Sequence, residues 1–296
     1  MLFHIEGGGR FGNQNINLIN FLALSIEYKV NIYSFPLFFT HGIFKINEKT
    51  IKNFKHKKNF PYLLRLLQYC VYFFVKFLRI NCVILNDTEL NINTKRVIFD
   101  QEIFLRDSLS QNTVLFGWSF RFWGLVQKHE EKIRKLFLEL MPQKNSKKDN
   151  RTLLVHMRGS DFKTHAGGKL YYSFNDYLTA IEKIEKDIFF SNLVFLSDDK
   201  TIYDQRQLKT FASKKKYPIK ISKGCVTKEG SQEDAFNELL MADFIVTSGS
   251  SFSLSAAWFS NSKAIDINCV LGKTSLNCII SSNLFMDNES FSLNWK

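Results

Sequence analysis

Short apolar runs and segments of helical periodicity alternate along the second half of the chain. A short apolar run between polar residues predicts a buried strand, and apolar residues at intervals of three and four predict an amphipathic helix. The expected strands cover residues 152–157, 192–196, 217–221, 243–247 and 263–267, and the expected helices cover residues 174–186, 201–213, 232–241 and 252–260. Alternation of this kind predicts an α/β fold with a parallel sheet and helices on both of its faces.

The beginning of the chain carries one unit of the same kind. Residues 2–5 predict a strand, residues 7–13 a loop, residues 17–28 a helix and residues 30–35 a second strand. This β-loop-α-β unit predicts that the first half is also α/β, although residues 36–130 carry no motif that we can interpret.

A polar segment separates the two halves. Residues 142–150 read Pro-Gln-Lys-Asn-Ser-Lys-Lys-Asp-Asn, between a helical stretch at 130–141 and the strand at 152. Domain boundaries fall in such breaker-rich segments. We therefore expect an N-terminal, acceptor-side Rossmann-like domain at 1–145 and a C-terminal, nucleotide-sugar-binding one at 151–296.

The composition fits a globular protein in a reducing compartment. The 296 residues are 45% apolar, enough for one large domain or two ordinary ones. The cysteines are scattered and form no Cys-x-x-Cys pair, which argues against a zinc ribbon or a disulfide framework; they are Cys70, Cys82, Cys225, Cys269 and Cys278. The N-terminus shows no basic stretch followed by an apolar one, so we expect no signal peptide and a cytoplasmic location.

The formal net charge of +12 reflects a general abundance of lysine. Because no nucleic-acid-binding motif accompanies it, a solvated lysine surface is favoured and no nucleic-acid partner is expected. Residues 54–80 are both basic and strongly apolar, and Arg65, Lys76 and Arg79 make them too charged for a membrane span. A helix packed in the first domain is favoured there. The alternative is a surface-lying helix that contacts anionic lipid, peripheral on the inner face of the membrane.

The first candidate site is the glycine-rich segment 7–12, which matches Gly-x-Gly-x-x-Gly after a strand and before a helix. A dinucleotide site of this type also needs an acidic residue at the end of the second strand, to hold the ribose. Residues 31–35 contain none, and Glu27 lies inside the expected helix. NAD binding is therefore disfavoured, while backbone amides at the helix start could still receive a phosphate or a sugar.

The second candidate is His-Met-Arg-Gly-Ser-Asp at 156–161, where an apolar strand ends. Ligands of open α/β sheets bind at the carboxyl ends of strands, and the planar fork of arginine suits a phosphate. We therefore expect a phosphorylated ligand near Arg158. The structural alternative is a salt bridge between Arg158 and Asp161.

Two further strand ends carry polar residues. Ser197, Asp198 and Asp199 follow an apolar strand, where an aspartate either caps the next helix or accepts hydrogen bonds from a ribose or base. Residues 248–253 form a Ser/Gly turn before a helix, and the free N–H groups of a helix start attract anions. Capping explains one serine of this turn but not all of them.

No metal site is expected. The six histidines are dispersed, without His-x-x-x-His, and no Asp-x-Asp is suited to a divalent cation. A diphosphate leaving group would then be stabilised by side-chain cations and helix ends, which Arg158, Ser250 and Ser251 supply.

Taken together and in this order, the four elements resemble the α-1,2-fucosyltransferase family and its wider fucosyltransferase superfamily. The resemblance spans residues from about 5 to 265 and rests on four segments: Gly-Arg-Phe-Gly-Asn-Gln at 9–14, His-Met-Arg-Gly-Ser-Asp at 156–161, Phe-Leu-Ser-Asp-Asp at 195–199, and residues 234–258 with Leu-Leu-Met, Ser-Ser-Phe-Ser and Ala-Ala-Trp. Three positions depart from the family: Gly159 replaces a second arginine, residues 15–18 lack the usual Phe-Gln-Tyr, and Leu254-Ser255 replaces a tandem tryptophan.

The resemblance implies a GT-B fold with two Rossmann-like domains facing a central cleft. It implies an inverting, metal-independent transfer of fucose from GDP-fucose to a glycan hydroxyl, and we expect the galactose 2-OH as the acceptor group and bacterial surface polysaccharide as the product. Arg158 matches the family's essential arginine at the β-phosphate, and Asn13 matches an asparagine that reaches the same region from the other domain. The alternatives are a related transferase that uses another nucleotide sugar and a non-catalytic GDP- or carbohydrate-binding protein of the same fold.

The residues predicted for the site fall into two groups. The catalytic residues are Arg158 and Asp161, with Glu6 and His156 as alternative general bases. The predicted donor-binding residues are Gly12, Asn13, His156, Ser197, Asp198, Asp199, Ser250, Ser251 and Phe252.

Overall fold

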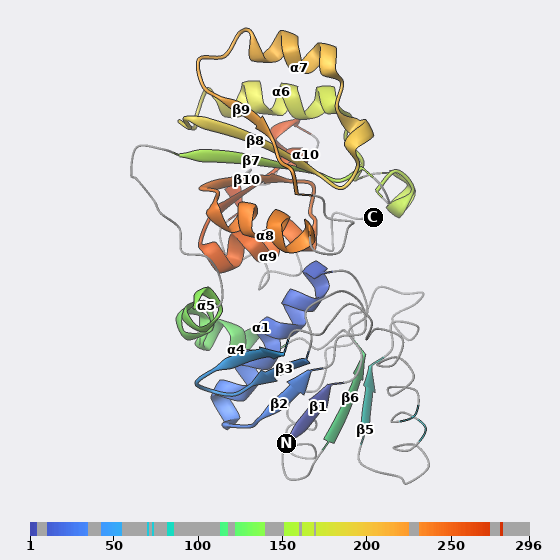
Figure 1. Cartoon of the computed structure of the whole chain (residues 1–296), viewed down its shortest axis with the longest axis vertical. Coiled ribbons are helices and arrows are strands. Elements are labelled where there is room, and N and C mark those ends of the chain that lie inside the picture. The colour runs from blue at the N-terminus through green and yellow to red at the C-terminus, as the bar shows by residue number, and fades with distance from the viewer. Residues whose placement is uncertain are drawn as a thin grey trace. The chain divides into compact units, whose positions relative to one another are not determined.

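The computed structural model divides the chain into two compact units, Met1–Leu140 and Met141–Lys296 (Figure 1). The residues that it describes are 1–4, 11–34, 43–54, 70, 73, 82–85, 113–117, 122–139, 151–159, 162–168, 170–224, 231–272 and 279–280. The glycine-rich residues 7–10 and most of the basic segment 54–80 lie outside the described residues.

A six-stranded sheet organises the first unit, in the order β4-β3-β2-β1-β6-β5. Its strands are β1 (Leu2–His4), β2 (Ile32–Ser34), β3 (Ile43–Ile46), β4 (Ile51–Phe54), β5 (Cys82–Leu85) and β6 (Thr113–Gly117). β1 is parallel to both β2 and β6, and β5 is parallel to β6, whereas β3 pairs antiparallel with β2 and with β4. The predicted β-loop-α-β start is confirmed, and the antiparallel pair β3 and β4 is an addition to it.

Helix α1 (Phe11–Tyr28) begins six residues before the predicted start at Asn17. Residues 11–13, which we expected in a loop, therefore form its first turn. α1 is held to α4 (Trp123–Lys128) and α5 (Glu130–Leu138) by polar contacts. The Asn20 side chain accepts from the Phe122 amide at 2.5 Å, and the Glu27 carboxylate contacts Lys128 and His129 at 2.6 Å each.

The second unit is a six-stranded sheet in the order β12-β11-β10-β7-β8-β9, in which only β12 runs antiparallel to its neighbour. Its strands are β7 (Thr152–Met157), β8 (Asn192–Ser197), β9 (Ile219–Ile221), β10 (Phe244–Thr247), β11 (Lys263–Asp266) and β12 (Ile279–Ile280). Its helices are η2 (His165–Gly168), α6 (Phe174–Ile184), η3 (Lys200–Ile202), α7 (Gln205–Ala212), α8 (Ser231–Met241), α9 (Ser251–Ser260) and α10 (Ile267–Val270).

The alternation predicted from the sequence is confirmed in this unit, with one break. The helix expected over 201–213 is split into η3 and α7. The split occurs because the Asp204 carboxylate accepts from the amides of Arg206 and Gln207, at 2.8 and 3.0 Å, and so starts a new helix there.

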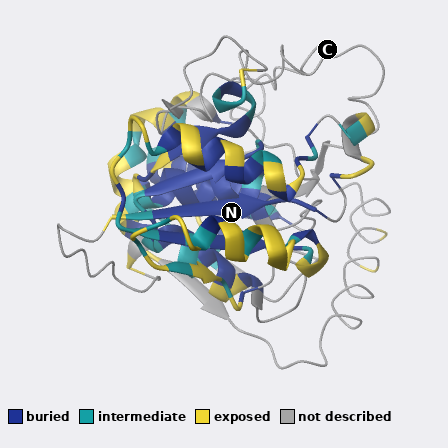
Figure 2. Cartoon of the chain, turned by 90° about the horizontal axis from the view of Figure 1, so that it is seen from above, coloured by how far each residue is buried: buried dark blue, intermediate teal, exposed yellow. Residues whose placement is uncertain are grey.

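Helices cover both faces of this sheet, α6 and α7 on one face and α8 and α9 on the other (Figure 1). Successive side chains of a strand point to opposite faces, and β7 follows this rule. Leu153, Val155 and Met157 belong to the apolar core that includes α6, while the His156 ring contacts Phe252 of α9. Figure 2 shows the strands buried between helices whose outer sides are exposed. The predicted α/β class with two Rossmann-like units is therefore confirmed.

One cysteine of the second unit is bonded. Cys269, in α10, is disulfide-bonded, so the scatter of cysteines along the sequence did not exclude a disulfide. Of the basic segment 54–80, the structure describes Phe54 at the end of β4, Cys70 and Phe73, and the last two are exposed. Within the described residues, every helix is too short or too polar to cross a membrane.

Candidate functional site

Three of the predicted motifs lie side by side at the carboxyl ends of β10, β7 and β8. These strands are adjacent and parallel, with Val246 paired to Val155 and Met157 paired to Ser197. The residues that follow each strand therefore emerge at one edge of the sheet. This edge joins the Ser/Gly turn, Arg158 and the Asp198-Asp199 pair, which are distant in sequence.

Arg158 is held in place by groups on two sides. Its Nη1 lies 3.1 Å from Oδ2 of Asp198, and the side chains of the two residues are 8% and 0% exposed. The guanidinium carbon also lies 4.8 Å from the ring centroid of Phe162, a cation–π distance. The alternative partner considered from the sequence, Asp161, lies outside the described residues. The pair with Asp198 was missed because it joins residues of different strands.

Gly159 is a position of close backbone approach. Its amide donates to Oδ1 of Asp198 at 2.7 Å. A Cβ added at residue 159 would lie 2.7 Å from Cβ of Asp199, closer than two carbons can approach without displacement. The departure from a second arginine is therefore built into the packing of this edge.

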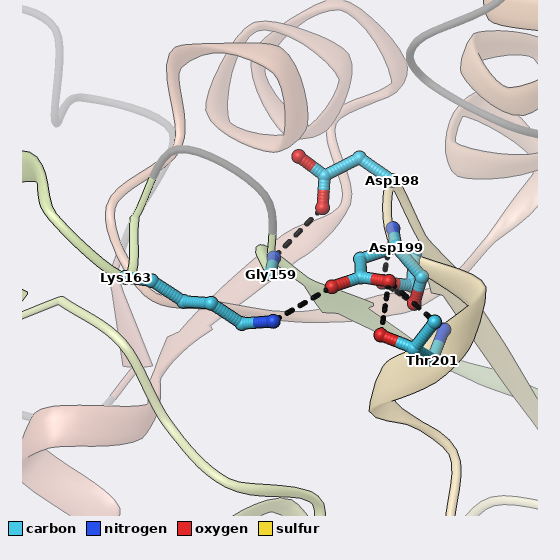
Figure 3. Close-up of polar contacts among 6 residues, drawn as sticks. Gly159, Lys163, Asp198, Asp199 and Thr201 are labelled. Atoms are coloured by element: carbon cyan, nitrogen blue, oxygen red, sulfur yellow. Dashed lines mark hydrogen bonds and ion pairs between the residues drawn. The ribbon is translucent and has the colours of Figure 1, made fainter.

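Asp199 is the predicted helix cap. Its Oδ1 accepts from the amide and the hydroxyl of Thr201, at 2.9 and 2.6 Å, at the start of η3. Its Oδ2 pairs with Nζ of Lys163 at 3.0 Å. The Thr201 hydroxyl and the Lys163 ammonium together hold the pKa of the Asp199 carboxyl below its usual value. Figure 3 shows Lys163 reaching Asp199 while Asp198 points toward Gly159.

Ser197 and Lys163 complete this cluster. The Ser197 hydroxyl accepts from the Asp199 amide at 3.1 Å and donates to the Asp199 carbonyl at 3.1 Å, so it shapes the turn itself. Lys163 was not singled out from the sequence. Its position in a loop soon after Arg158 was a weak signal, because the loop gave no indication of which acid it would meet.

His156 is completely buried on the α9 side of β7. Its ring lies 5.5 Å from that of Phe252, and neither ring nitrogen has a hydrogen-bond partner within the part of the chain that the structure describes. Burial, reinforced by the charge of Arg158, lowers the pKa of His156 to about 3. The imidazole is therefore neutral at physiological pH.

The Thr247 side chain stabilises the Ser/Gly turn before α9 through hydrogen bonds. Its Oγ1 accepts from the amides of Gly249 and Ser250, at 3.2 and 3.3 Å, and exchanges a 2.7 Å hydrogen bond with Ser253. Gly249 has φ of +90°, a backbone conformation that favours glycine.

The serines of this turn have different roles. Ser253 is structural, whereas Ser250 stands at the N-cap of α9 without a side-chain cap bond. Ser251 begins the helix and is half-buried. The first N–H groups of a helix have no acceptor within the helix, and such a helix start attracts anions.

The remaining predicted residues are in the first unit or outside the described residues. Gly12 is buried in the first turn of α1. Asn13 is in the same turn, but its side chain is not among those described, and Glu6 and Asp161 lie outside the described residues altogether. Among the residues described, no cluster of histidine, cysteine, aspartate or glutamate could hold a metal ion.

Comparison with protein-family models finds no match, and neither does comparison with curated proteins. Among solved structures, the chain is similar to a crystal structure of POFUT1 in complex with GDP, at 12% sequence identity and a TM-score of 0.45, over 88% of this chain and 94% of that one. It is similar to POFUT1 in complex with GDP-fucose at 12% identity and a TM-score of 0.46, over 88% and 92% of the two chains. Similarity at this level of identity and TM-score assigns no role to any residue of this chain.

Proposed function

We propose that this chain is an inverting, metal-independent glycosyltransferase that moves fucose from GDP-fucose to a hydroxyl of a glycan acceptor, with the galactose 2-OH as the expected acceptor group. The observation that carries the proposal is the placement of Arg158. Its guanidinium lies at the carboxyl end of β7, paired at 3.1 Å with Asp198, the first residue after β8, and the start of α9 follows the adjacent strand β10. The four sequence motifs supply the identity of the donor.

The proposed reaction is a single displacement. The acceptor oxygen bonds to the anomeric carbon as the bond from that carbon to the β-phosphate oxygen breaks, and GDP leaves with the electron pair. Asp161, of the motif at 156–161, is the proposed base for the hydroxyl proton, a role that requires its carboxylate to come within hydrogen-bond reach of the hydroxyl. Acceptor and linkage follow from the resemblance rather than from the geometry.

Charge develops on the leaving diphosphate, and groups that bind it more strongly in the transition state accelerate the step. Arg158 offers parallel charge-assisted hydrogen bonds to phosphate oxygens. The α9 start adds backbone N–H groups and the positive end of a helix dipole. Ser250 and Ser251 are therefore proposed to contact the diphosphate together with Arg158.

The first experiment compares the thermal shift produced by GDP, UDP, CMP and NAD, with and without EDTA. A ligand that binds only the native state raises its melting temperature. The proposal expects a shift that is selective for GDP and insensitive to EDTA, followed by transfer from GDP-fucose in an acceptor screen. A UDP-selective shift would point to another nucleotide sugar, and GDP binding without turnover would indicate a non-catalytic binding protein.

A pair of matched variants locates the site. Arg158→Ala should strongly reduce transfer, whereas Arg206→Ala, at an exposed position of α7, should leave it intact. Equal transfer by both variants would refute the assignment of Arg158.

A further inference from the structure

We infer that Asp198 is a positioning residue: its carboxylate fixes the guanidinium of Arg158 before the donor arrives and does not itself bind the donor. This inference rests on the proposed function, because it takes Arg158 as the group that stabilises the leaving diphosphate. It differs from the expectation that Asp198 contacts a ribose or a base.

Both oxygens of the Asp198 carboxylate contact the chain itself. Oδ2 lies 3.1 Å from Nη1 of Arg158, and Oδ1 accepts from the Gly159 amide at 2.7 Å. One carboxylate therefore holds the tip of the Arg158 side chain and the peptide that follows the same residue. The Asp198 side chain is 0% exposed, so a ligand would have to displace these contacts to reach it.

The backbone determines where this contact forms. β7 and β8 are adjacent and parallel, with Met157 paired to Ser197, so Arg158 and Asp198 are the first residues beyond two neighbouring strand ends. Neighbouring strands lie about 4.8 Å apart, which brings the two side chains together without a flexible loop. Groups built on rigid elements hold their geometry better than groups on loops.

The surroundings also restrict the orientation of the guanidinium. The guanidinium carbon lies 4.8 Å from the centroid of the Phe162 ring, and Nη1 pairs with the Asp198 carboxylate. A buried cation is unfavourable without a partner, and Asp198 supplies that partner when no phosphate is bound.

The charge of Asp198 works against phosphate binding, and this makes the inference testable. A carboxylate repels a nearby diphosphate, so a direct contact between the two would lower affinity. Pairing with Arg158 offsets that charge and orients the guanidinium at the same time. Asp198 should therefore matter more to the rate of transfer than to the affinity for GDP.

The test uses Asp198→Asn in the full-length chain, with Asp204→Asn as its matched control. The amide oxygen can still accept from the Gly159 amide, but the ion pair to Arg158 is lost. Asp204, an exposed cap of α7, receives the same substitution away from the site. GDP affinity is measured by titration, and kcat is measured in a transfer assay with GDP-fucose. We expect kcat of Asp198→Asn to fall on the order of 100-fold, the cost of a small misplacement, with little change in GDP affinity and no change in the control.

Chemical rescue supplies a readout that a merely structural role would not move. Free guanidinium should restore part of the activity of Arg158→Ala. The Asp198 carboxylate and the Phe162 ring, which contact the Arg158 guanidinium in the wild type, still form a binding site for it. Free guanidinium should not restore the double variant Arg158→Ala with Asp198→Asn. Equal rescue of both variants would overturn the inference, as would a parallel loss of GDP affinity and kcat in Asp198→Asn, which indicates a direct donor contact.

Two further comparisons keep the outcome interpretable. If Asp198→Asn does not fold, Asp198→Glu keeps the charge and displaces it by one methylene, and the same fall in kcat at unchanged GDP affinity is expected. If the wild-type chain neither binds GDP nor transfers fucose, the proposed function fails and this inference fails with it. If the wild type is active and Asp198→Asn matches it, the inference alone is wrong.

Discussion

Asp198 and Asp199 are neighbours in sequence, and each pairs with a cation from the segment after β7, but one pair is inside the second unit and the other is near its surface. The side chains of Asp198 and Arg158 are 0% and 8% exposed, whereas those of Asp199 and Lys163 are 16% and 47% exposed. Water screens the second pair and barely reaches the first.

The difference separates a positioning contact from a local one. Removing one partner of a buried pair leaves an uncompensated charge and costs about 3–5 kcal/mol, while an exposed pair contributes about 0–1 kcal/mol. The Asp199 carboxylate is also occupied with Thr201 at the start of η3. The two aspartates of this motif thus have different functions, a buried ion pair at Asp198 and a helix cap at Asp199. The sequence alone does not distinguish them.

The largest expected effect concerns the two cations. Arg158→Ala should lower kcat for transfer by about a hundredfold to a thousandfold, as expected when a donor to a developing oxyanion is removed. Lys163→Ala should lower it by less than about tenfold, because its ammonium is largely solvated. Steady-state kinetics with GDP-fucose measure both variants. Comparable losses in the two would contradict the division between the pairs.

The next effect is on stability. Asp198→Ala should lower the free energy of unfolding by about 3–5 kcal/mol, because Arg158 is left buried without its carboxylate partner. Asp199→Ala should cost about 1–2 kcal/mol, mostly through the lost cap. Urea denaturation measures both, and Asp204→Ala, which removes only a cap, provides the reference. A cost at Asp198 no larger than at Asp204 would show that the buried pair is not needed for the fold.

A smaller effect tests the packing between the two motifs. Gly159→Ala should destabilise the chain by about 1–3 kcal/mol, as overpacking does, because its Cβ would lie 2.7 Å from Cβ of Asp199. Asp199→Gly should relieve the strain and Asp199→Ala should not, since alanine keeps the Cβ. Gly124→Ala is the control, because a Cβ there meets nothing within 4 Å. If Asp199→Gly and Asp199→Ala changed the stability of Gly159→Ala equally, the contact would be disproved.

The effect of pH concerns His156, on the opposite face of β7 from the apolar α6 core. Burial lowers its pKa to about 3 in the folded chain, while the unfolded value is about 6.5. The unfolded state therefore binds more protons between these values, and stability falls as pH decreases below about 6.5. Between pH 7 and 5.5 the loss should reach about 1 kcal/mol.

His156→Phe removes this titration, so the free energy of unfolding should depend less on pH below about 6.5. Chemical denaturation of both proteins at several pH values measures the difference, which should grow as pH falls. If the free energy of unfolding of wild type and His156→Phe changed equally with pH, His156 would not be buried in its neutral form.

The smallest effect is the response to salt. A double-mutant cycle between Lys163 and Asp199 should give a coupling below about 1 kcal/mol that shrinks further at high salt. The coupling between Arg158 and Asp198 should persist under the same conditions, because buried pairs are screened much less. Two couplings that respond equally to salt would remove the distinction between the pairs.

The elements of the second unit could be predicted because their signals are local. Each apolar run and each helical period lies within one segment, and the predicted strands 152–157 and 192–196 match β7 and β8 to within one residue. The antiparallel strands β3 and β4 were not predicted, since residues 36–130 show no comparable pattern. The start of α1 was placed too late because the glycines before Phe11 suggested a longer loop.

The site was predicted in its positions but not in its contacts. Arg158, Asp198 and Ser250 were each located at a strand end, which the sequence indicates directly. Their mutual distances depend on the strand order β10-β7-β8, and no local pattern encodes that order. The 3.1 Å pair between Arg158 and Asp198 and the cation–π contact with Phe162 are therefore properties of the assembled sheet.

The close approach of Gly159 to Asp199 has a consequence for how related chains can diverge. The two positions share one volume, so a side chain can occupy it from the end of β7 or from the end of β8, but not from both. A chain that carries arginine at position 159 and keeps the aspartate at 199 must have a wider separation of the two strand ends. The residue type at 159 is therefore linked to the distance between the two strand ends, even though forty positions separate 159 from 199 along the chain.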